Sequence, residues 1–160
     1  VSARNAFDGI IDDVSIYNRV LTPDEVRAAY NGGALVVGEQ YARRPAGDTG
    51  DDPVGWWSFE EGSGATAYDI SGSGNDGTLS GGPVWKSMGK IGGALEFDGT
   101  DDSVLVANHA SLQFQDYITI SAWIKTSYSS GTIFDKYASS GFGPKFSLSS
   151  GNLNFLSYDS

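Results

Sequence analysis

Two carboxylates lie among apolar residues, in segments that alternate with the period of a β-strand. Asp12 shares the apolar face of segment 10–17, and Glu61 shares the apolar face of segment 56–61. A lone carboxylate costs free energy when it is buried in apolar surroundings, so each of these needs a partner or a raised pKa. Hydrogen bonds from the backbone amides of neighbouring loops are the simplest partners, and a bound hard cation is the functional alternative.

A further group of carboxylates forms an acidic turn. Asp98, Asp101 and Asp102 surround Gly99, but their spacing lacks the length and the terminal Glu of an EF-hand loop. We expect a solvated turn here, because Asp and Gly are favoured in turns for their backbone conformations. Asp98 and Asp102 remain the second candidate pair for a metal ion.

The single histidine, His109, lies in the loop segment 107–111, and the sequence contains no cysteine. Without a second His or a Cys, a metal-ligating or catalytic-triad role for His109 has little support. The absence of cysteine excludes disulfides and Cys-ligated zinc or iron–sulfur sites. We therefore expect His109 to be a surface loop residue.

Several aromatic side chains are expected at the surface, where their faces could stack on sugar rings. They are Trp56, Trp85, Tyr128, Tyr137 and Phe142. No regular spacing marks them as a binding platform, so simple coverage of a sheet face is the alternative, above all for Trp56 and Trp85.

Two strands that carry candidate residues can be predicted in detail. In segment 10–17, Ile10, Val14 and Ile16 are expected to share one face with Asp12. The clearest strand has Ile118, Ile120, Ala122 and Ile124 on one side and Thr119, Ser121, Trp123 and Lys125 on the other.

One short helix is predicted near residues 23–31. Thr22 and Glu25 form a T-x-x-E capping box, and Pro23 suits the first helical position. Asn31 and the two glycines after it end the helix. A helix of about two turns is too short to stand alone, so it must pack on another element.

The composition is typical of an all-β domain. The chain has 160 residues, of which 22 are Gly, and 12% are aromatic. Short strands follow one another with glycine-rich turns between them, for example in the hairpin predicted between 145–148 and 153–158. This pattern favours a two-sheet sandwich or jellyroll.

Charge and chain ends restrict the function further. The formal net charge is −10, and an acidic surface repels phosphate backbones, so nucleic acid is not an expected partner. No run of about 18 apolar residues is present, so no membrane span is expected. The sequence starts at Val1 without a signal peptide and stops inside an apparent strand, which indicates a piece of a longer protein.

Several motifs together resemble one known family, the LamG-like jellyroll domains, which share the laminin-G and concanavalin-A-like sandwich. The opening half of such a domain is matched by WSFEEGSG at 57–64, ALEFDG at 94–99 and ITISAWI at 118–124. The closing strand and helix are matched by the segment 7–26, FDGIIDDVSIYNRVLTPDEV. The resemblance implies an all-β, two-sheet antiparallel jellyroll, a fold found in many bacterial surface and secreted proteins.

The order of the motifs is the reverse of the family's order. We therefore interpret residues 1–34 as the C-terminal strand and helix of one LamG-like domain and 55–160 as the N-terminal half of a second. Residues 35–54, which lack apolar periodicity, are the predicted linker of this tandem repeat. The jellyroll is expected to be incomplete or permuted.

Truncation leaves the second domain without its own closing strand. Residues 7–30 are predicted to take that place, because an open sheet edge and an uncovered apolar face favour docking. The expected contacts join Val14 or Ile16 to Trp57 or Phe59.

The resemblance also implies a cation. The related concanavalin-A-like laminarinases hold a structural calcium with an Asp on a closing strand of similar pattern, and the first and last strands of the family lie near one another. It thus implies that Asp12 and Glu61 meet at a structural calcium, for which oxygen ligands are suited. Hydrogen bonding of both carboxylates to loop amides is the alternative.

For function, the resemblance implies a non-catalytic binding or adhesion module of a repetitive extracellular or cell-surface protein, with a polysaccharide or cell-surface glycan as partner. The alternative is an accessory carbohydrate-binding domain of a secreted glycoside hydrolase or other multidomain enzyme. Glu96, Asp98 and Asp101 resemble the E-x-D-x-x-E strand of some jellyroll glycoside hydrolases. Because the last residue is Asp and Gly99 breaks the strand, we expect no enzyme activity.

Overall fold

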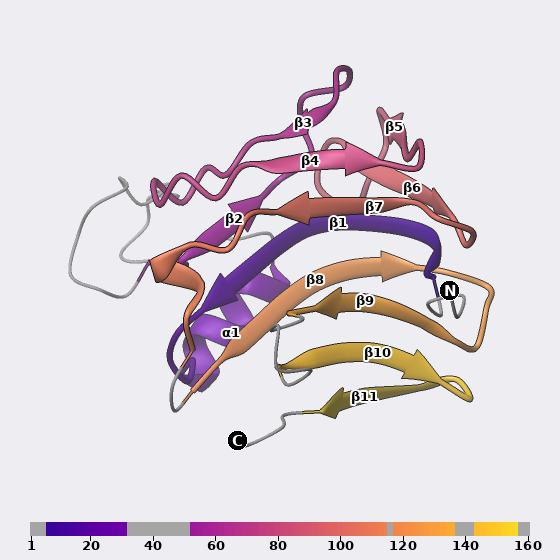
Figure 1. The fold of residues 1–160 in the computed structure, drawn as a ribbon. Coiled ribbons are helices and arrows are strands. Elements are labelled where there is room, and N and C mark those ends of the chain that lie inside the picture. The colour runs from indigo at the N-terminus through magenta and orange to yellow at the C-terminus, as the bar shows by residue number, and fades with distance from the viewer. Residues whose placement is uncertain (1–5, 32–51, 115–116, 137–142, 157–160) are drawn as a thin grey trace.

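The computed structural model describes residues 6–31, 52–114, 117–136 and 143–156. Most of its elements are strands that pair antiparallel, so the all-β prediction is confirmed (Figure 1). The strands are β1 (Asp8–Tyr17), β2 (Gly55–Trp57), β3 (Thr66–Ala67), β4 (Gly77–Ser80), β5 (Val84–Lys86), β6 (Ala94–Asp98), β7 (Ser103–Val106), β8 (Thr119–Lys125), β9 (Gly131–Asp135), β10 (Lys145–Ser149) and β11 (Asn152–Leu156). The helices are α1 (Pro23–Tyr30) and the 3-10 turn η1 (Ala110–Leu112).

The N-terminal strand β1 lies inside the sheet formed by later segments. It pairs with β8 over most of its length, with β2 through the pair Val14 and Trp57, and with β6 through the pair Ile11 and Leu95. Figure 1 shows β1 (indigo) running between β8 and the strands above it. The predicted docking of the N-terminal segment, including the contact between Val14 and Trp57, is confirmed.

A β-bulge in β1 changes which residues face the core. The pairing with β8 shifts register between Asp12 and Ser15, and Asp13 adopts a positive φ of 51°. The extra residue moves the alternation by one position, as bulges do. Ile11 and Ile16 are therefore buried in the core.

The single-face prediction for Ile10, Val14 and Ile16 with Asp12 is therefore wrong. Val14 and Ile16 contact the core, whereas Asp12 lies opposite Trp123 and Ile10 lies opposite the exposed Lys125 on the other face of the sheet. Strict alternation cannot hold across the bulge, so the face of Asp12 is not the face of Ile16.

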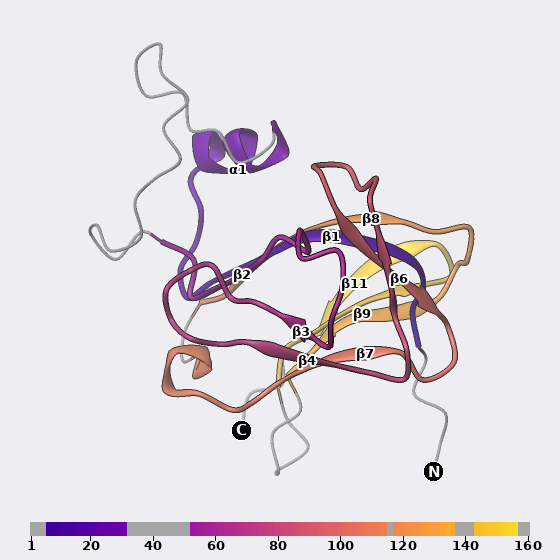
Figure 2. The ribbon, with the colours of Figure 1, turned by 90° about the horizontal axis from the view of Figure 1, so that it is seen from above.

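The core lies between the β1-containing sheet and a second layer of β3, β4 and β7. Its buried residues are Phe7, Ile11, Ile16, Trp57, Phe59, Ala67, Leu95, Phe97 and Leu148. Seen from above, the second layer lies on one side of β1 and β8, and α1 lies on the other (Figure 2). The predicted apolar face of segment 118–124 is confirmed for Ile118, which directly precedes β8, and for Ala122 and Ile124 of β8, which pack against the core.

Strands β9, β10 and β11 form a further antiparallel sheet. The predicted hairpin is present, with Ser150 and Gly151 both at positive φ in the turn between β10 and β11. Positive φ at both central residues is the signature of the two-residue hairpin turn whose twist matches the strands. A parallel bridge between Ala6 and Thr132 joins this sheet to the segment that enters β1.

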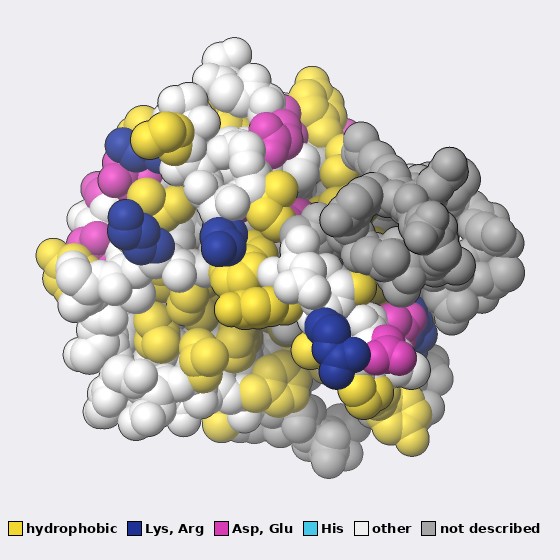
Figure 3. Space-filling model, turned by 180° about the vertical axis from the view of Figure 1, so that it is seen from behind, with side chains coloured by type: hydrophobic (Ala, Val, Ile, Leu, Met, Phe, Trp, Pro, Cys, Tyr) yellow, Lys and Arg dark blue, Asp and Glu magenta, His cyan; other side chains and the backbone are white. Residues whose placement is uncertain are grey.

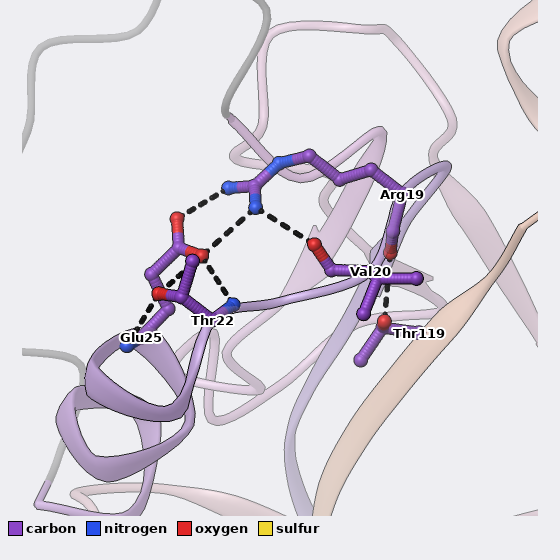
Figure 4. Close-up of polar contacts among 5 residues, drawn as sticks. All are labelled: Arg19, Val20, Thr22, Glu25 and Thr119. Carbon is purple, nitrogen blue, oxygen red and sulfur yellow. Dashed lines mark hydrogen bonds and ion pairs between the residues drawn. The ribbon is translucent and has the colours of Figure 1, made fainter.

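Helix α1 contributes no buried side chain, and its first turn is held to the sheet by polar contacts. The predicted capping box is present: Thr22 Oγ1 accepts from the Glu25 amide, and Glu25 accepts from the Thr22 amide. The two terminal nitrogens of the Arg19 guanidinium, Nη1 and Nη2, donate to the two carboxylate oxygens of Glu25 at 2.9 and 2.7 Å (Figure 4). Thr119 Oγ1 of β8 donates to the Arg19 carbonyl at 2.7 Å, which ties this cluster to the sheet.

The predicted linker 35–54 lies outside the described residues except for its last three positions. There Val54 donates its backbone amide to the Ile16 carbonyl at 2.7 Å and packs against the core. In the part of the chain that the structure covers, no helix has the length and hydrophobicity needed to cross a membrane.

The ion pair of Arg19 and Glu25 predicts a pH-dependent stability. Hydrogen bonds from Arg19 hold the pKa of Glu25 at about 2, below its ordinary 4.5. A lowered pKa gives stability that is complete above the ordinary value and is lost as the pH falls toward about 2. We expect the free energy of unfolding to drop by about 1 kcal/mol over this range, because partial exposure screens the pair.

Urea titrations at a series of pH values measure this loss, and Glu25→Gln should flatten the profile. Asp24→Asn is the matched control, because Asp24 bonds to Arg27 on the exposed side of the same helix. Equal slopes for wild type and Glu25→Gln would contradict the assignment to Glu25.

Candidate cation site and aromatic hollow on the outer face

We call the side of the β1–β8 sheet that carries α1 the outer face. Residues directly opposite one another in an antiparallel pair share a face, so Asp12 and Trp123 are neighbours here, and so are Ile10 and Lys125. Figure 3 views the molecule from behind, on the α1 side. Hydrophobic side chains gather in its middle and lower parts, with basic side chains beside them.

A glycine-rich loop, 87–93, covers Asp12 on this face. Asp12 Oδ2 accepts hydrogen bonds from the backbone amides of Lys90 and Ile91, at 2.7 and 2.8 Å. A Cβ at Gly89 would come within 2.6 Å of Asp12 Oδ2, and a Cβ at Gly93 would collide with the Phe59 carbonyl. The glycines thus allow the loop backbone to approach β1 and the segment after β2 closely.

Asp12 is a buried carboxylate that is only partly satisfied. Its side chain is 1% exposed, and Oδ1 is buried with no hydrogen-bond partner among the described residues. Burial raises the pKa of Asp12, the Ile91 and Lys90 amides oppose this, and the charges of Asp13 and Glu60 raise it further. An additional proton or a cation at Oδ1 would relieve this cost.

Glu61 has a similar environment on a different loop. Its Oε1 accepts from the Tyr68 amide at 2.7 Å, and its Oε2 is buried with no partner among the described residues. Asp12 and Glu61 thus bond to backbone amides of different loops, as the alternative interpretation expected, and each keeps one orphaned oxygen. A calcium shared by these two residues stays a prediction.

The oxygen chemistry of this region suits a hard cation. The orphaned Oδ1 of Asp12 is a buried anionic oxygen, and Glu60 is the nearby carboxylate whose charge acts on Asp12. Glu60 is also close to the loop that covers Asp12, because a Cβ at Gly92 would collide with its carboxylate. Carboxylate oxygens are preferred ligands of calcium, so the residues fit such an ion.

The second candidate pair lies in an exposed turn between β6 and β7. Asp98, Asp101 and Asp102 each place one carboxylate oxygen within 4.8 Å of the others. Two of these carboxylates already serve the turn: Asp102 Oδ2 accepts from the Asp98 amide and Asp98 Oδ1 accepts from the Thr100 amide. The contacts describe the solvated turn that we expected, and a metal at Asp98 and Asp102 stays a prediction.

The other candidates have structural contacts. Glu96, the first carboxylate of the hydrolase-like spacing, forms an ion pair with Lys86 at 2.5 Å. His109 is exposed, accepts from the Ser111 amide and caps η1, as expected of a loop residue.

Two of the five aromatic candidates use their polar atoms within the fold. Trp56 Nε1 donates to Asp13 Oδ1 at 2.6 Å, and Trp85 Nε1 donates to the Gly64 carbonyl at 2.9 Å. Tyr128 is exposed. Tyr137 and Phe142 lie outside the described residues.

A different aromatic pair forms a hollow on the outer face. Tyr30 at the end of α1 packs on Trp123 of β8, with ring centroids 5.2 Å apart. Together with Asn31, Lys90 and Ile91 they line a hollow of about 310 Å³. The ammonium of Lys90 lies 5.0 Å from the centroid of the Trp123 ring. The hollow thus combines aromatic walls with an amide and a cation.

The sequence interpretation did not select this hollow. The available signal was Trp123 itself, a large aromatic on the otherwise polar side of β8 with Thr119 and Ser121. The residues that surround Trp123 come from distant parts of the chain: Asp12 lies opposite it on β1, and Tyr30 and Lys90 line the hollow with it. Only the docking of β1 and α1 brings them together.

No family model, no curated protein and no solved structure matches this chain.

Proposed function

We propose that this chain is a non-catalytic module that binds a saccharide in the hollow between Tyr30 and Trp123. The carrying observation is the composition of the hollow, in which two aromatic side chains stand beside the polar groups of Asn31 and Lys90. Sugar rings present C–H groups that pack on aromatic faces and hydroxyls that bond to polar groups, and binding sites are concave surfaces of this mixed kind.

We further propose that the chain is a LamG-like jellyroll from a secreted or cell-surface protein. Its role is adhesion to a polysaccharide or a cell-surface glycan. The sequence motifs support the family and the confirmed β fold is consistent with it. The alternative is that the chain is an accessory carbohydrate-binding domain of a secreted hydrolase, and in that role the hollow would bind the saccharide in the same way. In either protein, calcium at Asp12 is the proposed structural ion, supported by the orphaned Oδ1.

Removing one aromatic wall is expected to weaken saccharide binding. Tyr30→Ala should lower the affinity by about threefold to tenfold, the value of one aromatic contact. Trp123→Ala should lower it further, since Trp123 is the larger of the two aromatic residues that line the hollow. Glycan-array screening followed by calorimetric titration with the best ligand measures both effects.

Tyr128→Ala is the matched control, because Tyr128 is 59% exposed, Tyr30 is 69% exposed, and only Tyr30 lines the hollow. Both tyrosine variants should keep the wild-type melting temperature. Equal losses for the two variants, or no binding of wild type to any glycan, would refute the proposal.

A further inference from the structure

The hollow carries a positive charge that the fold leaves without a counter-ion. Within the described residues, Arg19, Arg27 and Lys86 each form an ion pair with a carboxylate. Lys90 makes no such pair, and its ammonium contacts the Trp123 ring instead. It is also exposed, so the charge is available to a ligand.

A second lysine lies on the same face. Lys125 follows Trp123 by two positions on β8, and alternation along a strand places both side chains on the outer face. Lys125 is exposed, and it forms no ion pair among the described residues. The outer face of this chain, whose net charge is −10, thus carries two cations beside one aromatic hollow.

Asp12, which lies in contact with the backbone of Lys90, does not neutralise its ammonium. Asp12 lies beneath the loop, and its Oδ2 is engaged by the backbone amides of Lys90 and Ile91 rather than by the Lys90 ammonium. This anchoring fixes the backbone of Lys90 while its side chain reaches over Trp123. Asp12 therefore acts as a positioning residue for the cation of the hollow.

We propose that the hollow selects saccharides that bear a carboxylate, such as a uronic acid, with Lys90 as the counter-ion and Trp123 and Tyr30 as the stacking surfaces. This acidic specificity rests on the saccharide binding proposed above and names the class of saccharide that the hollow prefers. A charge-assisted hydrogen bond between an ammonium and a carboxylate is stronger than a neutral one, and it favours the acidic ligand over a neutral analogue. Lys125 adds a longer-range attraction that salt weakens.

Calorimetric titration compares a uronic-acid oligosaccharide with a neutral hexose oligosaccharide of equal length. We expect the acidic ligand to bind wild type about tenfold more tightly at low salt, the value of one charge-assisted hydrogen bond. Lys90→Gln should remove most of this preference, because it weakens the binding of the acidic ligand far more than the binding of the neutral one. Higher salt should reduce the preference in wild type and have little effect in Lys90→Gln.

Lys136→Gln is the control, because the Lys136 ammonium bonds to Asn108 and does not line the hollow. It should keep the wild-type preference. Equal affinities of wild type for the two oligosaccharides, or an unchanged preference in Lys90→Gln, would overturn the acidic specificity and leave saccharide binding intact. Failure of both oligosaccharides to bind would overturn the proposed function as well.

Discussion

A variant that lacks residues 1–31 is expected to lose cooperative folding. Each of β2, β6 and β8 pairs with β1, so the deletion leaves three strands with open edges. It also removes the core side chains Phe7, Ile11 and Ile16. Deleting one large buried side chain costs about 2–5 kcal/mol, and a domain is stable by only about 5–15 kcal/mol. Thermal and urea unfolding followed by circular dichroism should show no transition.

A pair of point variants tests the same idea without deletion. Ile16→Ala should cost about 3 kcal/mol, because Ile16 is 2% exposed in the centre of the core. Val20→Ala should cost less than about 0.5 kcal/mol, because Val20 is 66% exposed. A cooperative, wild-type-like transition in the deletion variant, or equal effects of the two point variants, would mean that β1 is a peripheral strand.

Features governed by local sequence could be predicted accurately. The capping box of Thr22 and Glu25 is formed as expected, because both partners lie within one helical turn. The β10–β11 hairpin follows from the turn residues Ser150 and Gly151, which supply positive φ. The placement of β1 was also predictable, since its apolar side chains bury little surface if the strand stays detached.

The bulge in β1 could not be predicted from alternation. The segment 10–17 alternates equally well without an extra residue, and only the pairing with β8 shows the shift after Asp12. Asp13 accommodates the bulge, because Asp adopts positive φ more readily than most side chains and its carboxylate is bonded by Trp56. One unnoticed bulge moved Asp12 from the expected core face to the outer face.

The candidate site was predictable only in part. The amide partners of Asp12 and Glu61 could be expected, because a carboxylate that is buried without a partner costs free energy. The hollow depends on long-range placement: α1 brings Tyr30 and the 87–93 loop brings Lys90 to Trp123. No spacing along the chain encodes such a meeting, and it comes from how β1, β6 and β8 pair.

The expected effect of removing the Asp12 side chain is large. Asp12→Ala leaves the amides of Lys90 and Ile91 without their acceptor and opens a cavity beneath the loop. The two unsatisfied donors and the cavity together cost about 2 kcal/mol of unfolding free energy, after allowance for the burial cost of the lost charge. Asp12→Asn keeps the shape and an acceptor oxygen, so without a cation it should be as stable as wild type or more stable. Denaturant titrations in chelator measure both variants.

Calcium should reverse the order of wild type and Asp12→Asn. Burial raises the pKa of Asp12 above its ordinary value of 3.8. The free energy of unfolding therefore falls as the pH rises above 3.8 and Asp12 has to ionise in its buried position. A calcium ion bound at Oδ1 offsets that cost in wild type and, at a hundredfold excess over its Kd, adds about 2.7 kcal/mol. Asp12→Asn lacks the charge and should not respond, whereas Asp102→Asn should respond like wild type, because Asp102 lies in the exposed β6–β7 turn. A wild-type midpoint that does not move in millimolar calcium would exclude the ion, and a response lost only in Asp102→Asn would place it in the acidic turn.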